Sequence, residues 1–186
     1  MRRICVALVH HPVLERSGGV ITTAITNLDL HDIARSSRTY GVTDMFVVHP
    51  VEAQRELAEK VRDHWLHGSG SRRIPDRIEA MRILRVVPSL ADVFESFGGR
   101  SEVEVWTTSA RSLGKGMSLA EARKTLDATG RPVLILFGTG WGLAPDVVSD
   151  ADVHLVPIRA QADTGFNHLS VRAACAITLD RLLGDG

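Results

Sequence analysis

Eight residues, LFGTGWGL at Leu136–Leu143, decide the fold, and they overlap the end of an apolar run, VLILF at Val133–Phe137. The run is typical of a strand buried on both faces. Three glycines in five residues let the backbone turn sharply at the strand end and approach a ligand closely. Their spacing is not that of a dinucleotide fingerprint, and no Gly-Lys-Ser/Thr follows as in a Walker loop. On this segment alone, a ligand loop and a plain Gly-rich turn with a packing Trp both remain open.

Five further apolar runs of strand length flank this segment, with amphipathic stretches between them. The expected strands are Ile4–His10, Asp44–Val48, Ile83–Val87, Val103–Thr107 and Val153–Pro157. The expected helices are Val51–Leu66, Ser118–Thr129 (opening on a capping box) and Ser170–Leu183, and Gly68–Pro75 is expected to be a loop. The alternation predicts a single α/β domain over residues 1–186, a parallel sheet flanked by helices. Ligands bind such sheets at the carboxyl ends of the strands.

The composition is that of an ordinary globular domain, with 44% apolar and 24% charged residues. The 22 basic residues balance the 22 acidic ones, whereas a protein that grips nucleic acid through many phosphates usually carries excess positive charge. Neutrality therefore disfavours an extended nucleic-acid surface but allows a local basic face. Five arginines could form such a face, or only a plain solvated surface: Arg72, Arg73, Arg77, Arg82 and Arg85.

The sequence predicts no metal site, disulfide or membrane segment. Cys5 and Cys175 each lie inside an apolar run, so two buried thiols are expected. No Cys/His cluster has metal-ligand spacing, and the apolar run near Met1 is too short for a signal or membrane segment. We expect a soluble, cytoplasmic protein without a metal.

A second informative segment is Val156–Ile158 followed by FNHLSVRAACAI at Phe166–Ile177. Asn167 or Ser170 could cap the helix that begins there. The free N–H groups of a helix start suit a carboxylate or a polarised oxygen. A capped core helix without a ligand is the simpler alternative.

Together these segments resemble the SPOUT (α/β-knot) superfamily of methyltransferases. In that family the Gly-rich turn, a short turn after the next strand and the last helix start form a deep C-terminal trefoil knot. Here the matching segments are Leu136–Leu143, Val156–Ile158 and Phe166–Ala173. The resemblance implies that S-adenosylmethionine (SAM) is bound, mostly through backbone groups, by Ser109, Ala110, Phe137, Gly138, Thr139, Gly140, Trp141, Gly142, Pro157, Ile158, Asn167, His168, Leu169, Ser170 and Val171.

The N-terminal half is similar to the first motif of the SpoU-type ribose methyltransferases, through DLHDIARSSRTYGV at Asp29–Val42. Arg35 falls on that family's catalytic arginine. Asp29 replaces an Asn of the motif, His31 replaces a Gly, and Gly140 stands where many SpoU-type enzymes have Glu. The resemblance covers essentially the whole chain, and its motifs are specific for fold and cofactor but weak for substrate.

The resemblance implies a SAM-dependent methyltransferase acting on RNA, either tRNA or rRNA, at ribose or base. It also implies a homodimer in which the first helix of one subunit reaches the other's cofactor. Arg35 would anchor a phosphate, since a guanidinium stays protonated, and Asp29 with His31 could assist proton loss. The alternatives are a surface arginine in a salt bridge and two helix caps.

Three other residues stay open. His10 and His11 follow the first strand, where they could contact substrate or only form a turn. Trp141 lies in the ligand loop and could stack on a base, whereas the other tryptophans are expected in the core or an interface. Two rival functions also remain: a non-catalytic knot protein that binds SAM or RNA, and a methyltransferase whose substrate is a protein or a small molecule.

Overall fold

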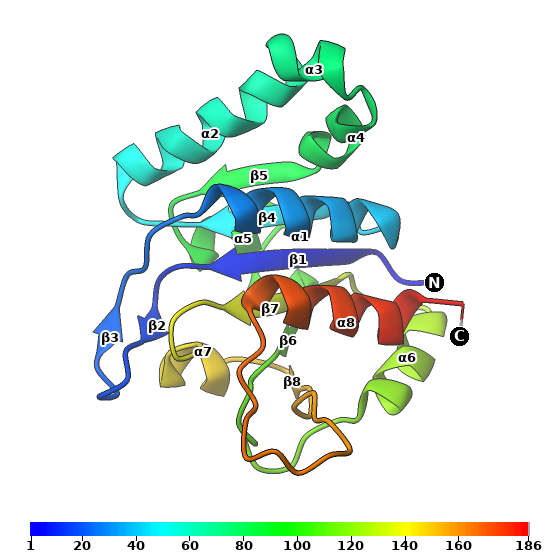
Figure 1. The fold of residues 1–186 in the computed structure, drawn as a ribbon. Helices are drawn as coiled ribbons and strands as arrows, with labels where there is room; N and C mark the ends of the chain where they lie inside the picture. The colour runs from blue at the N-terminus through cyan, green and yellow to red at the C-terminus, as the bar shows by residue number, and fades with distance from the viewer. Residues whose placement is uncertain (186) are drawn as a thin grey trace.

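The protein is built around a six-stranded parallel sheet, in a computed structural model that describes residues 1–185 (Figure 1). The strands are β1 Ile4–Val9, β4 Asp44–Val48, β5 Leu84–Val87, β6 Glu104–Thr107, β7 Val133–Gly138 and β8 Val153–His154. They lie in the order β5-β4-β1-β7-β6-β8, and each neighbouring pair is parallel. All six expected strands are present. Only β8 is much shorter than its expected range, because the chain leaves the sheet after His154.

The central strand β1 shows why the sheet is buried on both faces. Its six residues are all apolar and all buried, and it pairs with β4 on one side and β7 on the other. Side chains alternate along a strand, so Val6 and Leu8 join one layer of the core while Ala7 and Val9 join the other. A continuous apolar run is therefore required here rather than an alternating one.

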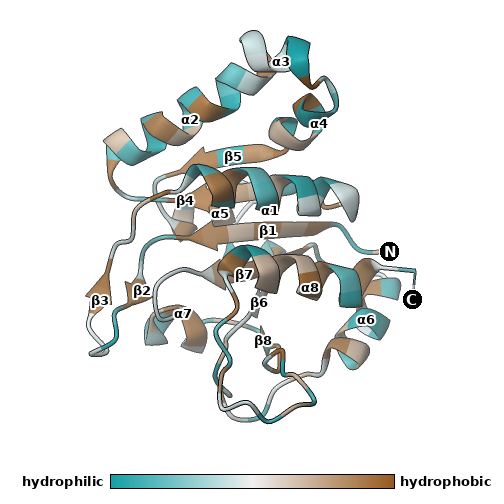
Figure 2. Cartoon of the chain, viewed as in Figure 1, coloured by the Kyte–Doolittle hydropathy of each residue, from teal (hydrophilic) through white to brown (hydrophobic). Residues whose placement is uncertain are grey.

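Helices cover both faces of the sheet. One face packs against α1 Asn27–Thr39, α2 Glu52–Leu66, α4 Asp76–Arg82, α6 Leu119–Asp127 and α8 Val171–Leu183, and the other against α5 Leu90–Glu95 and α7 Pro145–Ser149. Figure 1 shows α1 and α8 side by side in front of the central strands, with α2 and α4 beyond β5. The strands β1, β4 and β5 are mostly hydrophobic, and α1 and α2 alternate between polar and apolar residues (Figure 2).

Side-chain caps fix where three of these helices begin. The Thr26 hydroxyl accepts a hydrogen bond from the Asp29 amide at the start of α1, and Ser170 accepts one from the Ala173 amide at the start of α8. Ser118 and Glu121 form the expected capping box at α6. Each cap satisfies an amide that the helix itself leaves free.

The two thiols are buried and free, as predicted. Burial raises the pKa of the Cys175 thiol to about 12, so it stays protonated near neutral pH. Cys175 therefore acts as a small apolar residue in the core between α8 and the sheet.

The short helices α4, α5 and α7 were not predicted from the sequence, and two further features differ from the predictions. The stretch Gly68–Pro75, expected to be a loop, contains the short helix α3 Ser69–Arg73. It packs beside α2 because a side chain at Gly70 would come within 2.7 Å of the Trp65 ring, so glycine allows the close approach. The hairpin β2 Val13–Leu14 and β3 Val20–Ile21 was not predicted, since two-residue strands carry no visible periodicity.

Candidate functional site

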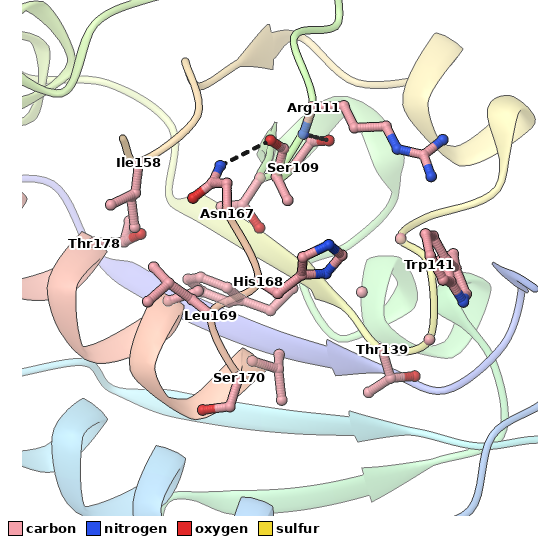
Figure 3. Close-up of a pocket in the computed structure, with 18 of the residues that line it drawn as sticks. Ser109, Arg111, Thr139, Trp141, Ile158, Asn167, His168, Leu169, Ser170 and Thr178 are labelled. Carbon is pink, nitrogen blue, oxygen red and sulfur yellow. Dashed lines mark hydrogen bonds between the residues drawn. The ribbon is translucent and has the colours of Figure 1, made fainter. Parts of the chain in front are cut away.

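A cavity of about 780 Å³ opens at the carboxyl end of the sheet (Figure 3). Its walls come from the segment before α1, the loops after β6, β7 and β8, and the first two turns of α8. Parallel sheets place their ligands at this edge, and the size is that of a site for a small organic molecule.

The Gly-rich loop after β7 forms one wall. A side chain at Gly138 would lie 2.7 Å from the Leu143 amide nitrogen, so only glycine lets the two ends of the loop approach this closely. Gly140 has a φ of +59°, and the amide of Trp141 donates to the Leu14 carbonyl at 2.8 Å. The hairpin β2–β3 therefore holds the loop from outside, which leaves its backbone and the Trp141 ring at the cavity.

The opposite wall is formed by the loop after β8 and the start of α8. The Asn167 side-chain amide donates to the Ala110 carbonyl at 3.2 Å, which ties this loop to the loop after β6. Figure 3 shows Ile158, Leu169 and Thr178 on this side, across the cavity from Trp141 and Thr139. Apolar side chains thus line a pocket whose polar groups are mostly backbone and hydroxyl.

The structure brings nearly all of the candidate cofactor residues to this one cavity. The lining residues among them are Ser109, Ala110, Phe137, Gly138, Thr139, Gly140, Trp141, Gly142, Ile158, Asn167, His168, Leu169, Ser170 and Val171. Pro157 does not line the cavity, although both of its neighbours do. Their binding of SAM remains a prediction.

Sequence reasoning missed eleven lining residues: Thr23, Ala24, Thr26, Thr108, Arg111, Leu119, Leu155, Val156, Gly165, Ala174 and Thr178. Five of these, Thr108, Arg111, Val156, Ala174 and Thr178, directly flank predicted positions or follow them by one or two helical turns, so they could have been found by extension. Thr23–Thr26 carries no motif. It reaches the cavity through a contact that spans the chain, between the hydroxyls of Thr23 and Thr139.

Asp29 lies at the cavity, but the proposed pairing of Asp29 with His31 is wrong. The Asp29 carboxylate accepts a hydrogen bond from the Thr26 hydroxyl at 2.7 Å and lies 3.3 Å from the Arg172 guanidinium. His31 points to the other side of α1, where its ring lies edge-on to Trp65 with centroids 5.3 Å apart. Residues two apart on a helix do not face each other, so the carboxylate cannot orient this imidazole.

Arg35 also lies outside the cavity, in a groove of about 610 Å³ between α1, α2 and α4. Within residues 1–185 its guanidinium forms no hydrogen bond or ion pair, and Lys60 and Arg77 line the same groove. Burial and the nearby Arg77 lower the pKa of His31 there, so the imidazole is neutral near pH 7. Lys60 lies 3.8 Å from Glu56, so in the described residues the groove joins two cations without an ion pair, Arg35 and Arg77, to the Trp65 ring, which the Arg77 guanidinium overlies at 4.5 Å.

The expected arginine cluster is divided by the fold. Arg77 lines the groove, whereas Arg82 pairs with Glu79 and Arg85 lies 3.3 Å from Asp44. Arg38, one turn after Arg35, lies 3.6 Å from Glu79. These pairs, with that of Lys60 and Glu56, account for part of the local positive charge and leave Arg35 and Arg77 as the uncompensated cations of the groove among the described residues.

A buried histidine pair supports the cavity from behind. His10 and His49 are almost fully buried, with ring centroids 5.5 Å apart. The Thr23 hydroxyl lies 3.0 Å from Nδ1 of His10, and Nε2 of His49 lies 2.9 Å from the Thr23 carbonyl. Burial, with the neighbouring His49, lowers the pKa of His10 to about 4. Both rings are thus placed to hold Thr23, rather than to meet substrate as His10 could have done.

Other kinds of site are absent from the described residues. No group of three or more His, Cys, Asp or Glu side chains in residues 1–185 is arranged to hold a metal. No helix in that part of the chain is long and apolar enough to cross a membrane.

Comparison with known proteins identifies the family of this chain. A family model described as SAM-dependent RNA methyltransferase matches residues 3–184. The chain belongs to the family of SAM-dependent RNA methyltransferases.

Two relatives show how far the match extends. The chain is 43% identical, over 99% of its length, to a tRNA (guanine-N(1)-)-methyltransferase of Nitratidesulfovibrio vulgaris. It is 37% identical, over 96% of its length, to an uncharacterised protein of Aquifex aeolicus, of which it covers 87%. It covers 43% of the first protein, so it spans less than half of the relative that has a named activity.

Solved structures share the parallel sheet flanked by helices. The chain superposes on TrmJ from Z. mobilis ZM4 with a TM-score of 0.63 at 19% identity, covering 100% of this chain and 69% of that one. The SpoU methyltransferase AviRb from Streptomyces viridochromogenes, solved with AdoMet, gives a TM-score of 0.60 at 14% identity, covering 98% and 57%. At these identities the likeness concerns the fold alone.

Proposed function

We propose that this chain transfers the methyl group of SAM to RNA, and that tRNA is the RNA to test first. The observation that carries the proposal is the glycine-walled cavity at the carboxyl end of the sheet, in a chain of this family. The relatives named as tRNA methyltransferases support tRNA over rRNA. Because the chain matches less than half of those proteins, guanine N1 is not carried over as the methylated atom.

The cavity fits SAM by size and by chemistry. Leu119, Leu155, Ile158 and Leu169 offer apolar surface for the faces of an adenine, and backbone groups of residues 138–142 and 109–111 offer hydrogen bonds for its edges and for the ribose. A side chain at Gly138 would displace the wall, which accounts for a glycine at that position. When bound, SAM supplies a methyl group on a positively charged sulfur.

Asp29 is the proposed acceptor for the proton that the RNA atom loses. Among the described residues it is the one carboxylate that lines the cavity. Thr26 and Arg172 occupy two of its acceptor positions and fix its orientation, and an ionised carboxylate has about four such positions. A free lone pair can therefore accept a hydrogen bond from a substrate hydroxyl or N–H. His31 is withdrawn from this role because it faces the groove.

Arg35 is proposed to hold the RNA backbone rather than the reacting atom. It shares its groove with Lys60 and Arg77. A phosphate placed there would neutralise Arg35 and Arg77, which form no ion pair in residues 1–185, since Asp32 in the same groove lies 3.5 Å from Arg172 and Lys60 pairs with Glu56. Holding two reactants in place contributes several kcal/mol to such transfers.

We also propose the homodimer and the trefoil knot that the resemblance implies. Leu28 on α1 is 62% exposed, and Ala173, Ala176 and Ile177 on the neighbouring α8 are only half-buried. A second copy packed on α1 and α8 would cover this apolar surface and bring Arg35 of one chain toward the cavity of the other. For the knot, the support is the Asn167 contact, which holds the loop after β8 beside the loop after β6. The cytoplasm remains the predicted location.

A non-catalytic SAM or RNA binder is the second candidate function. The observation in its favour is that the Arg35 groove and the cavity share no lining residue, so Arg35 does not reach the cavity of its own chain. A protein or small-molecule substrate has no such observation in its favour.

The test is calorimetric titration with SAM and its demethylated product, followed by transfer of labelled methyl groups to bulk tRNA. Micromolar binding together with RNase-sensitive label would support the proposal. Binding without transfer would favour the non-catalytic reading, and label that survives RNase would indicate a different substrate. No binding at millimolar ligand would refute the cofactor assignment.

A further inference from the structure

Three aromatic rings gather at the mouth of the cavity although none of them belongs to the core. Trp141 is 42% exposed and Phe166 is 72% exposed, and His168 is exposed between them. The Trp141 and His168 rings meet edge to face with centroids 6.0 Å apart, and the Phe166 and His168 centroids lie 5.1 Å apart. The rings come from the loop after β7 and the loop before α8 and form one row.

Two arginines flank this row. The Arg111 guanidinium lies 5.5 Å from the centre of the Trp141 ring, and the Arg16 guanidinium lies 6.0 Å from it. Arg16 comes from the turn of the β2–β3 hairpin and Arg111 from the loop after β6. In the described part of the chain neither guanidinium pairs with a carboxylate. Figure 3 shows the Arg111 side chain extended past the cavity toward Trp141.

The row is held in place by backbone contacts rather than by burial of its rings. The Trp141 amide is bonded to the Leu14 carbonyl, and Gly140 and Gly142, on either side, both have positive φ. The loop that carries His168 is tied to Ala110 by the Asn167 side chain. Exposed aromatic rings on a fixed backbone are a surface prepared for a ligand, since packing of the chain itself does not need them.

The geometry points to a stacking platform for an unpaired nucleobase, formed by Trp141, His168 and Phe166, with Arg16 and Arg111 on the phosphates next to that base. Aromatic rings interleaved with cations are how proteins hold single-stranded nucleic acid, because every base has a π-face. The inference rests on the proposed RNA methyltransferase function and narrows it. The substrate is RNA whose target nucleotide is unpaired or turned out of its helix.

This platform also fits the neutral charge of the chain. Stacking supplies affinity without phosphates, so a few cations suffice and a large positive excess is not required. Two phosphate contacts on a single strand predict that the log–log slope of affinity against salt changes by about 1.4 when both arginines are removed.

The experiment measures binding of a fluorescein-labelled, unstructured RNA 12-mer and of a hairpin duplex of the same composition, with the protein saturated by demethylated SAM. Phe166→Ala and Arg16→Gln are the informative variants, because neither residue lines the cofactor cavity. Phe166→Ala is expected to weaken binding of the unpaired RNA by roughly tenfold or more, with SAM affinity unchanged within twofold. Arg16→Gln with Arg111→Gln should lower the salt slope, and Trp141→Phe should bind better than Trp141→Ala.

Lys124→Gln, an exposed change on α6, serves as the matched control and should leave all of these quantities unchanged. Equal binding of duplex and unpaired RNA by the native protein would overturn the platform, and so would unchanged RNA affinity in both Phe166→Ala and Arg16→Gln. These readouts need no turnover. A protein that binds unpaired RNA through the platform but never methylates it would refute the proposed function and keep this inference.

Discussion

The shape of the cavity depends on the absence of a side chain at Gly138. An added methyl group would lie 2.7 Å from the Leu143 amide nitrogen and 3.0 Å from the Gly142 carbonyl carbon, and backbone atoms cannot turn aside as a flexible side chain can. The Gly138→Ala variant should therefore shift the loop and weaken SAM binding by tenfold or more, as measured by calorimetry.

Gly130→Ala is the control for that change. It lies outside the cavity, and its added methyl group would meet only the Arg2 side chain. Equal SAM affinity in the two variants would show that the Gly-rich loop does not form the cofactor site.

His10 predicts a specific dependence of stability on pH. Its pKa falls from the ordinary 6.5 to about 4 in the folded chain, because burial and His49 disfavour the charged ring. The unfolded chain then binds more protons between these values, so the His10 contribution is complete above pH 6.5 and is lost as the pH falls toward 4. The loss in unfolding free energy is on the order of 3 kcal/mol.

The measurement is urea unfolding at several pH values from 7 to 4, for the native protein and for His10→Asn. The variant should lose less stability across this window, even though it starts lower because Thr23 loses its partner. His67→Asn, at an exposed histidine that caps the C-terminus of α2, should keep the native slope. Parallel curves for the native protein and His10→Asn would contradict the prediction.

At the scale of elements, α1 divides the site between its two sides. Asp29 faces the cavity and Arg172 of α8, whereas Arg35 faces α2 and α4. Arg35→Ala should therefore reduce RNA methylation at least a hundredfold while SAM affinity stays within twofold, since the residue is far from the cavity lining. Steady-state transfer and calorimetry on the same preparation check this.

Arg38→Ala gives a matched comparison on the same helix. Arg38 is exposed and lies 3.6 Å from Glu79, a surface pair of the kind that contributes little. Its removal should change transfer by less than threefold. Similar losses for the two variants would mean that α1 contributes general positive charge and no defined phosphate contact.

The elements that the sequence predicted are those with a strong local signal. β1 and β7 are long apolar runs because both of their faces are buried. The start of α6 is marked in the sequence by the capping-box residues Ser118 and Glu121. The hairpin β2–β3 and the helix α3 were missed because each depends on one distant or crowded contact, such as Leu14 against the Gly-rich loop.

The same distinction holds for the candidate site. The loop residues 137–142 could be placed at a ligand edge because a glycine cluster after a strand has few other uses. Thr23 could not, since its place depends on Thr139, 116 residues away, and on two buried histidines. The predicted pairing of Asp29 with His31 was wrong because a linear sequence motif does not show on which side of a helix each residue lies.

For the whole molecule, the question is whether one chain holds a complete site. Arg35 and the proposed SAM cavity lie in different parts of the same chain, and Leu28, which lines the Arg35 groove, is exposed and suits a second copy. Light scattering should give about twice the 20.3 kDa chain mass, and Leu28→Glu should return the single-chain mass without loss of thermal stability.

Mixing two inactive variants decides between a shared and a separate site. If Arg35 serves the partner's cavity, a dimer of one Arg35→Ala chain and one Gly138→Ala chain keeps one intact site, made of the cavity from the first and the arginine from the second. Half of the dimers are mixed after random exchange, so the mixture should recover about a quarter of native transfer. If Arg35 serves its own chain, every site in the mixture has one defect and no activity returns. Affinity tags that differ between the variants show whether exchange has occurred. If chains have exchanged and no transfer activity returns, Arg35 serves the cavity of its own chain and catalysis does not depend on the dimer.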